Sequence, residues 1–139
     1  MQFVDTNIFL RYLTRDDPEK AQACLNLFQR AARGEITLFT TETIIAEIVY
    51  VLSSPRLYNL SREGVRQRLL PLLTLSGLRI PNRRVVLRAL ELYESEPVDF
   101  EDALAVAHMA QQDIELIISY NRDFDRFSQI ARSEPDSHT

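Results

Sequence analysis

Several kinds of residue are scarce in this chain, and each scarcity excludes a class of protein. Cys24 is the only cysteine, so the chain can form no internal disulfide and cannot build a zinc site from thiolates. No apolar run approaches the roughly 20 residues that a membrane-spanning helix needs. The N-terminus shows no basic segment followed by an apolar stretch, which a secretory signal would have. We therefore expect a cytoplasmic protein with no membrane anchor.

Lysine is also scarce, because Lys20 is the only lysine beside 15 arginines. The net charge of −4 argues at first against a nucleic-acid partner. Arginine, however, is the better bidentate clamp for phosphates, and carboxylates that hold metal ions no longer repel them. A genome composition that favours arginine explains the same bias, so charge alone does not identify the partner.

The pattern of apolar residues alternates short strands with helices. Strands are expected at residues 2–5, 36–40, 78–80 and 115–119, and helices at 7–14, 17–33, 41–53, 61–75, 82–96 and 99–113, with Pro71 kinking or splitting the fourth. Such alternation implies parallel pairing through crossover helices. The predicted fold is a three-layer α/β/α sandwich with a central parallel sheet of four or five strands. It covers residues 1–130, and residues 131–139 are expected to form a polar, frayed tail.

Four acidic residues are attached to the apolar segments. Asp5 ends the first predicted strand, Glu47 lies inside the apolar run 43–49, Asp102 interrupts the run 100–107, and Asp123 follows the last predicted strand. Burying an ionised carboxylate is costly unless a partner neutralises it. Oxygen ligands prefer hard divalent ions such as Mg²⁺ or Mn²⁺. These four acids therefore indicate a shared metal ion, although other roles are open for each.

The other roles are structural. Asp5 is also a favoured cap for the helix that follows it. Glu47 falls at the edge of the apolar face of its helix, which a solvated glutamate can also occupy. Asp102 can act as the reciprocal acid of a capping box that begins at Asp99. Asp123 can be an ordinary loop acid. The two histidines, His108 and His138, are assigned to no catalytic role.

The order strand–Asp, helix–Glu, helix–Asp, strand–loop–Asp resembles the PIN-domain family, and more closely the small single-domain toxins of the VapBC type. The resemblance is carried by four stretches that together span nearly the whole chain: Phe3-Val4-Asp5-Thr6-Asn7, Ile44-Ile45-Ala46-Glu47-Ile48, Val98-Asp99-Phe100-Glu101-Asp102-Ala103-Leu104 and Ile118-Ser119-Tyr120-Asn121-Arg122-Asp123-Phe124. Many members of the family carry an acid where this chain has Asn121, and Asp123 stands close enough in the sequence to replace it.

The resemblance implies a metal-dependent endoribonuclease that hydrolyses RNA with Mg²⁺ or Mn²⁺. Asp5, Glu47 and Asp102 match the three acidic positions of the family, and Asp123 is the fourth candidate. The residues expected to orient these ligands are Thr6, Asn7, Asp99, Ser119 and Asn121. Toxins of this type pair with a small antitoxin protein and usually form homodimers, so both partners are expected here.

Three other classes compete with the nuclease. A phosphotransferase or phosphatase with an aspartyl nucleophile would have a second aspartate two residues after Asp5, where this chain has Asn7. A receiver domain would need a lysine beside its acids, and Lys20 lies in a helix of surface type. A PIN-like interaction module with weak or lost catalysis would keep the fold but not the acids, and it is the alternative we retain.

Overall fold

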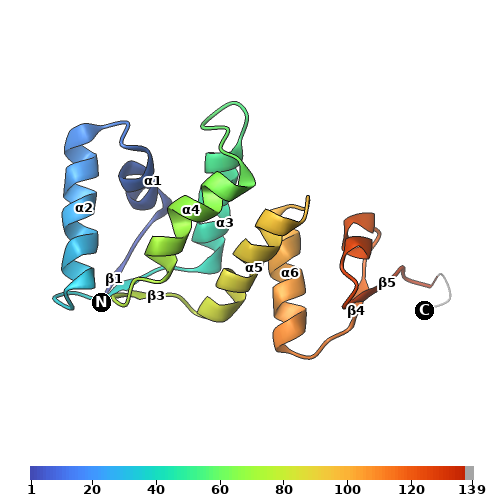
Figure 1. Cartoon of the computed structure of the whole chain (residues 1–139). Helices are drawn as coiled ribbons and strands as arrows, with labels where there is room; N and C mark the ends of the chain where they lie inside the picture. Colours follow the sequence, from blue (N-terminus) through green and yellow to red (C-terminus); the bar gives the residue numbers. More distant parts are fainter. Residues whose placement is uncertain (137–139) are drawn as a thin grey trace. The chain divides into compact units, whose positions relative to one another are not determined.

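The computed structural model describes residues 1–136, which form two compact units that divide between Arg83 and Arg84 (Figure 1). We describe each unit by itself. Parallel strands alternate with helices along the chain, and this confirms the predicted α/β class. His138 lies outside the described residues.

The first unit contains three short strands and four helices. The strands β1 (Gln2–Phe3), β2 (Leu38–Phe39) and β3 (Leu78–Arg79) form one parallel sheet with β2 in the middle. The helices are α1 (Thr6–Thr14), α2 (Pro18–Ala32), α3 (Glu42–Ser53) and α4 (Arg62–Leu73). Helix α1 follows β1 and helix α3 follows β2. Because these strands are parallel, the starts of both helices lie at the same edge of the sheet.

A helix cap and an aromatic contact, both at positions that the sequence pattern predicts, place the first two helices of this unit. Asp17 caps α2 by accepting a hydrogen bond from the Lys20 amide, and Pro18 occupies the first helical position. Phe28 of α2 packs against Phe9 of α1, with the ring centroids 5.4 Å apart. Burial of these aromatic rings helps to hold α1 against α2.

Gly77 allows the turn before β3 to approach the end of α2. A Cβ atom at this position would lie 2.2 Å from the carbonyl oxygen of Ala31, which is far inside van der Waals contact. The Gly77 carbonyl also accepts a hydrogen bond of 2.8 Å from the Leu38 amide of β2. A side chain here would therefore push α2 away from the sheet.

The second unit contains α5 (Arg83–Ser95, whose first residue belongs to the first unit), α6 (Phe100–Gln111), β4 (Leu116–Ile118), the 3₁₀-helix η1 (Arg122–Arg126) and β5 (Ala131–Ser133). Tyr93 of α5 meets Phe100 of α6 edge to face, and Phe124 and Phe127 are buried around η1. Strand β4 pairs with β5 in parallel.

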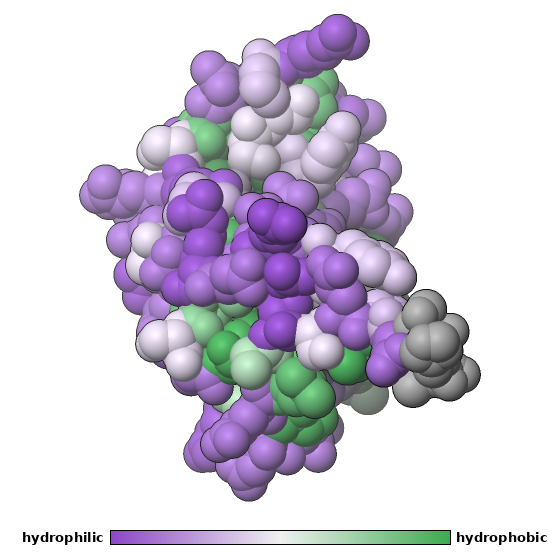
Figure 2. Space-filling view, turned by 90° about the vertical axis from the view of Figure 1, so that its right-hand side faces the viewer, coloured by the Kyte–Doolittle hydropathy of each residue, from purple (hydrophilic) through white to green (hydrophobic). Residues whose placement is uncertain are grey.

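Large apolar side chains also reach the surface. Leu116 and Ile118 of β4 are 53% and 57% exposed. Figure 2 shows hydrophobic residues at the surface between hydrophilic ones. Buried apolar side chains in the second unit come from α5, α6 and the segment around η1 rather than from its strands.

Five strands lie among residues 1–136, three paired in the first unit and two in the second. Two details differ from the sequence-based predictions. Residues 131–133, predicted to belong to a frayed tail, form β5, because β4 offers them a hydrogen-bonding partner. Pro71 does not split α4, which runs unbroken from Arg62 to Leu73, because the burial of Leu69, Leu72 and Leu73 holds the helix together although Pro71 has no amide to donate.

We expect Gly77→Ala to lower the free energy of unfolding by about 2 to 3 kcal/mol, because the new methyl group overlaps the backbone of Ala31. Gly34→Ala is the matched control. Gly34 has a φ of 79° but no atom within 4 Å of its would-be Cβ, so the same substitution costs only backbone strain of about 1 to 2 kcal/mol. Urea unfolding measures both losses. A smaller loss for Gly77→Ala than for Gly34→Ala would contradict the steric explanation.

Candidate active site

The first group of predicted site residues lies where β1 ends and α1 begins. Asp5 follows β1 as the N-terminal cap of α1, and its Oδ1 accepts a hydrogen bond of 2.6 Å from the Thr6 amide. Thr6 is buried, and its hydroxyl donates a hydrogen bond of 2.8 Å to Oε2 of Glu47 on α3. The structure thus connects two predicted ligands, 42 positions apart, through one threonine.

The parallel pairing of β1 with β2 explains this arrangement. The Val4 amide donates to the Phe39 carbonyl at 2.8 Å, and the hydroxyl of buried Thr40 donates back to the Val4 carbonyl at 3.2 Å. These bonds align the carboxyl ends of the two strands, which is where polar residues of parallel sheets serve chemistry. The buried face of α3, made by Ile45, Ile48, Val49 and Leu52, leaves Glu47 exposed.

The second group lies between α6 and the segment after β4. Asp102 occupies the first turn of α6, and its Oδ2 accepts a hydrogen bond of 3.2 Å from the Asn121 side-chain amide. The Asn121 carbonyl oxygen in turn accepts a hydrogen bond of 3.0 Å from the Asp123 amide. Ser119 holds the backbone of Asn121, because its hydroxyl oxygen accepts a hydrogen bond of 3.0 Å from the Asn121 backbone amide.

The electrostatics of this group are dominated by negative charge. Burial raises the pKa of Asp102 above the ordinary value of an aspartate, and the neighbouring charges of Asp99, Asp123 and Glu101 raise it further, whereas the hydrogen bond from Asn121 lowers it. Among the described residues, no cation is one of the groups that shift this pKa. Asp102 thus carries a charge that its surroundings orient but do not neutralise.

The structural roles weighed for these acids can now be compared with their contacts. Asp99 occupies the cap position of α6, but its side chain makes no capping hydrogen bond. The Asp102 carboxylate accepts a hydrogen bond from the Asn121 side chain, and this contact is not part of a capping box. Asp5 does cap α1, so the capping role expected as its alternative exists beside any chemical one. Asn7 lies exposed in the first turn of α1, and its role stays a prediction.

The donor set of both groups suits a hard divalent cation. Carboxylate oxygens predominate, and burial together with neighbouring carboxylates raises the pKa of Asp102, an effect that a cation would oppose. Among residues 1–136, no group of three or more His, Cys, Asp or Glu side chains lies close enough together to hold one ion. Both groups therefore fit Mg²⁺ or Mn²⁺ by the chemistry of their donors, and the complete set of ligands stays a prediction.

Two residues beside this site, Arg132 and Asp125, were not among those predicted from the sequence. Arg132 of β5 donates to Asp125 of η1 and to the Ser119 carbonyl, so it contacts the segment that carries Asn121 and Asp123. The available signal was an arginine between small residues after Ile130, which is too weak to indicate a strand. Its interactions depend on β5, which we expected to be a frayed tail.

The chain is similar to known proteins over most of its length. A model of the PIN domain matches residues 3–130. The chain belongs to the PIN-domain family. One curated relative is a protein called VapC ribonuclease from Aquifex aeolicus (strain VF5). It is 24% identical over 124 residues, which cover 89% of this chain and 90% of the relative.

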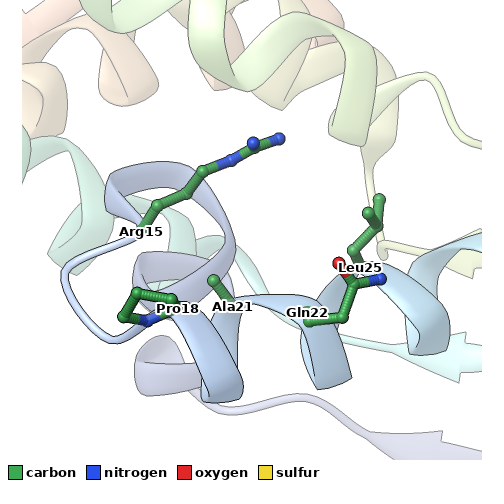
Figure 3. A pocket seen from close by; sticks show the side chains of 5 residues that line it. All are labelled: Arg15, Pro18, Ala21, Gln22 and Leu25. Atoms are coloured by element: carbon green, nitrogen blue, oxygen red, sulfur yellow. The ribbon is translucent and has the colours of Figure 1, made fainter.

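A pocket in the first unit is separate from the acidic groups. A pocket of about 330 Å³ in the first unit is lined by Arg15, Pro18, Ala21, Gln22 and Leu25 (Figure 3). None of these residues is acidic, and four of the five belong to α2, so the pocket is separate from the predicted ligands. None of the helices between residues 1 and 136 combines the length and the hydrophobicity that a membrane-spanning segment requires.

We expect Asp102→Asn to raise the free energy of unfolding of the metal-free protein at pH 7. Because the pKa of Asp102 is raised in the folded state, its contribution to stability is full below the pKa of an unfolded aspartate and is lost as the pH rises through the folded value. Asparagine mimics the protonated form, so its advantage should shrink below about pH 4.

Urea unfolding in EDTA at both pH values measures this difference. Asp113→Asn makes the same chemical change at an exposed residue whose φ of 57° asparagine readily adopts. An advantage for Asp102→Asn that is larger at pH 4 than at pH 7 would contradict the assigned cause.

Proposed function

We propose that this protein is a metal-dependent endoribonuclease and the toxin of a toxin–antitoxin pair. The observation that carries the proposal is the unneutralised acidic group around Asp102 in a chain of the PIN-domain family. The relative named VapC ribonuclease supports RNA as the substrate. A small antitoxin protein and a second copy of the chain are the partners that the resemblance to VapBC-type toxins implies.

Asp5, Glu47, Asp102 and Asp123 are the proposed ligands of Mg²⁺ or Mn²⁺. When bound, the ion supplies the positive charge that activates the attacking water and stabilises charge on the leaving oxygen. Thr6 orients Glu47, and Asn121 orients Asp102, each by one hydrogen bond. Both ends of the Asn121 amide are engaged, its nitrogen by Asp102 and its oxygen by the Asp123 amide. We therefore assign the fourth acidic role to Asp123 and a positioning role to Asn121.

Arginines are the proposed contacts for RNA phosphates, and two clusters are candidates: Arg83, Arg84 and Arg88, and Arg62, Arg66 and Arg68. In the first cluster, Arg88 already binds Glu91 at 2.9 Å, while Arg84 beside it is exposed. In the second, Arg68 donates a hydrogen bond of 3.1 Å to the Leu13 carbonyl at the end of α1. Arg84 is thus the best placed of these three to meet a phosphate.

The alternative is a PIN-like interaction module with weak or lost catalysis. Such a module has no need to keep its carboxylates unneutralised, because their mutual repulsion only costs stability. Calorimetric titration with Mn²⁺ separates the two functions. The enzyme should bind Mn²⁺ through Asp102, whereas the module should show the same weak binding with or without this carboxylate.

We expect Asp5→Asn and Asp102→Asn each to lower metal-dependent cleavage of RNA by more than about 100-fold, because each removes a proposed ligand rather than an orienting group. Circular dichroism should show an intact fold for both variants. Asp113→Asn is the control, since it makes the same substitution at an exposed residue outside the proposed site. Full activity of purified Asp5→Asn or Asp102→Asn would refute the assignment.

We also expect the affinity for single-stranded RNA to fall as NaCl is raised. Each phosphate neutralised by an arginine contributes about −0.7 to the slope of log K against log salt concentration, so three contacts predict a slope of about −2. The inactive Asp5→Asn variant allows binding to be measured without cleavage. Arg84→Gln should flatten the slope by roughly one contact. A salt-independent affinity would exclude phosphate contacts as the source of binding.

A further inference from the structure

Arg132 joins three segments of the second unit. Its Nε donates to Oδ1 of Asp125 at 3.0 Å, and its Nη2 donates to Oδ2 of the same carboxylate at 3.4 Å. Its Nη1 donates to the Ser119 carbonyl and to the carboxylate of Glu134, both at 3.0 Å. The side chain is only 13% exposed. A largely buried guanidinium with this many partners is fixed in one orientation.

These contacts hold both ends of the segment that orients Asp102. Ser119 stands at the start of this segment, just after β4, and Asp125 lies in η1 at its end. Between them, the Asn121 side chain can donate its hydrogen bond to Asp102 only if the Asn121 backbone stays in place. The Ser119 hydroxyl oxygen fixes that backbone by accepting a hydrogen bond from the Asn121 backbone amide. Arg132 thus reaches Asp102 through two intermediate residues.

We propose that Arg132 is a positioning residue, which fixes the Ser119–Asp125 segment so that Asn121 holds the Asp102 carboxylate in the orientation that metal binding requires. This inference rests on the proposed function, because it concerns the same group of ligands. Lysine cannot replace arginine in this role, since a single ammonium cannot bind Asp125 with two nitrogens and the Ser119 carbonyl with a third.

The experiment compares the full-length wild type with Arg132→Gln, Arg132→Lys and Asp125→Asn. Glu134→Gln is the matched control, because Glu134 binds the same guanidinium but does not contact the segment from Ser119 to Asp125. The first measurement is the NMR signal of the Asn121 side-chain amide in metal-free protein, identified by its absence in Asn121→Ala. The second is Mn²⁺ affinity by calorimetry at a temperature where all variants are folded.

We expect Arg132→Gln, Arg132→Lys and Asp125→Asn to shift the Asn121 amide signal and to weaken Mn²⁺ binding by about 10-fold or more. Glu134→Gln should change neither. The double variant Asp125→Asn/Arg132→Gln should bind Mn²⁺ no more weakly than whichever single variant has the lower affinity, because both changes break the same contact. If Arg132→Gln does not fold, Asp125→Asn gives the same test.

An unchanged Asn121 signal in the folded variants would overturn the proposal. So would an unchanged Mn²⁺ affinity beside a shifted signal, because Arg132 would then serve structure alone. Failure of the wild type to bind Mn²⁺ has a different meaning: it would refute the proposed function, while the NMR measurement, which needs neither metal nor RNA, would still report whether Arg132 controls Asn121.

Discussion

Negative charge that is oriented but not neutralised, around Asp102, is the constraint on which the proposed site depends. Burial and three neighbouring acids raise the pKa of this carboxylate, and the group that opposes them is the neutral amide of Asn121. A cation in that place would stabilise the metal-free protein but would compete with a metal ion for the carboxylate. A neutral donor fixes the geometry and leaves the charge available. Under the proposed function, this arrangement gives up stability in favour of a site for a divalent ion.

The first unit follows the same principle with different residues. Glu47 is held by the hydroxyl of buried Thr6, which is also a neutral donor, and Thr6 is in turn placed by the pairing of β1 with β2. Arginines contact the acids of the second unit in two ways. Arg132 binds Asp125 and Glu134, which are not proposed ligands, whereas Arg126 stands 4.0 Å from the proposed ligand Asp123 in an exposed pair, which contributes little because water screens it. Arginine therefore supports the frame around the acids.

Membership of the PIN-domain family and these contacts bear on different parts of the function. The family identifies the class of chain, over residues 3–130. The contacts show how individual acids are oriented, and they favour a catalytic role over an interaction module, since a module gains nothing from the like charges that raise the pKa of Asp102. They also separate Asn121 from Asp123, because an amide with both ends engaged is a poor candidate for a ligand.

The sequence by itself determined the α/β class and most of the helices, and it singled out the candidate acidic residues, because apolar periodicity, caps and the attachment of acids to apolar segments are local signals. Only tertiary structure decided which residues hold these acids. The bond from Thr6 to Glu47 spans 41 positions and that from Asn121 to Asp102 spans 19, and no local pattern encodes such pairs. Strand β5 and Arg132 were missed for the same reason. The three-residue strand β5 forms only because β4 lies beside it. Arg132 can hold the segment after β4 only when that pairing brings its guanidinium to the Ser119 carbonyl.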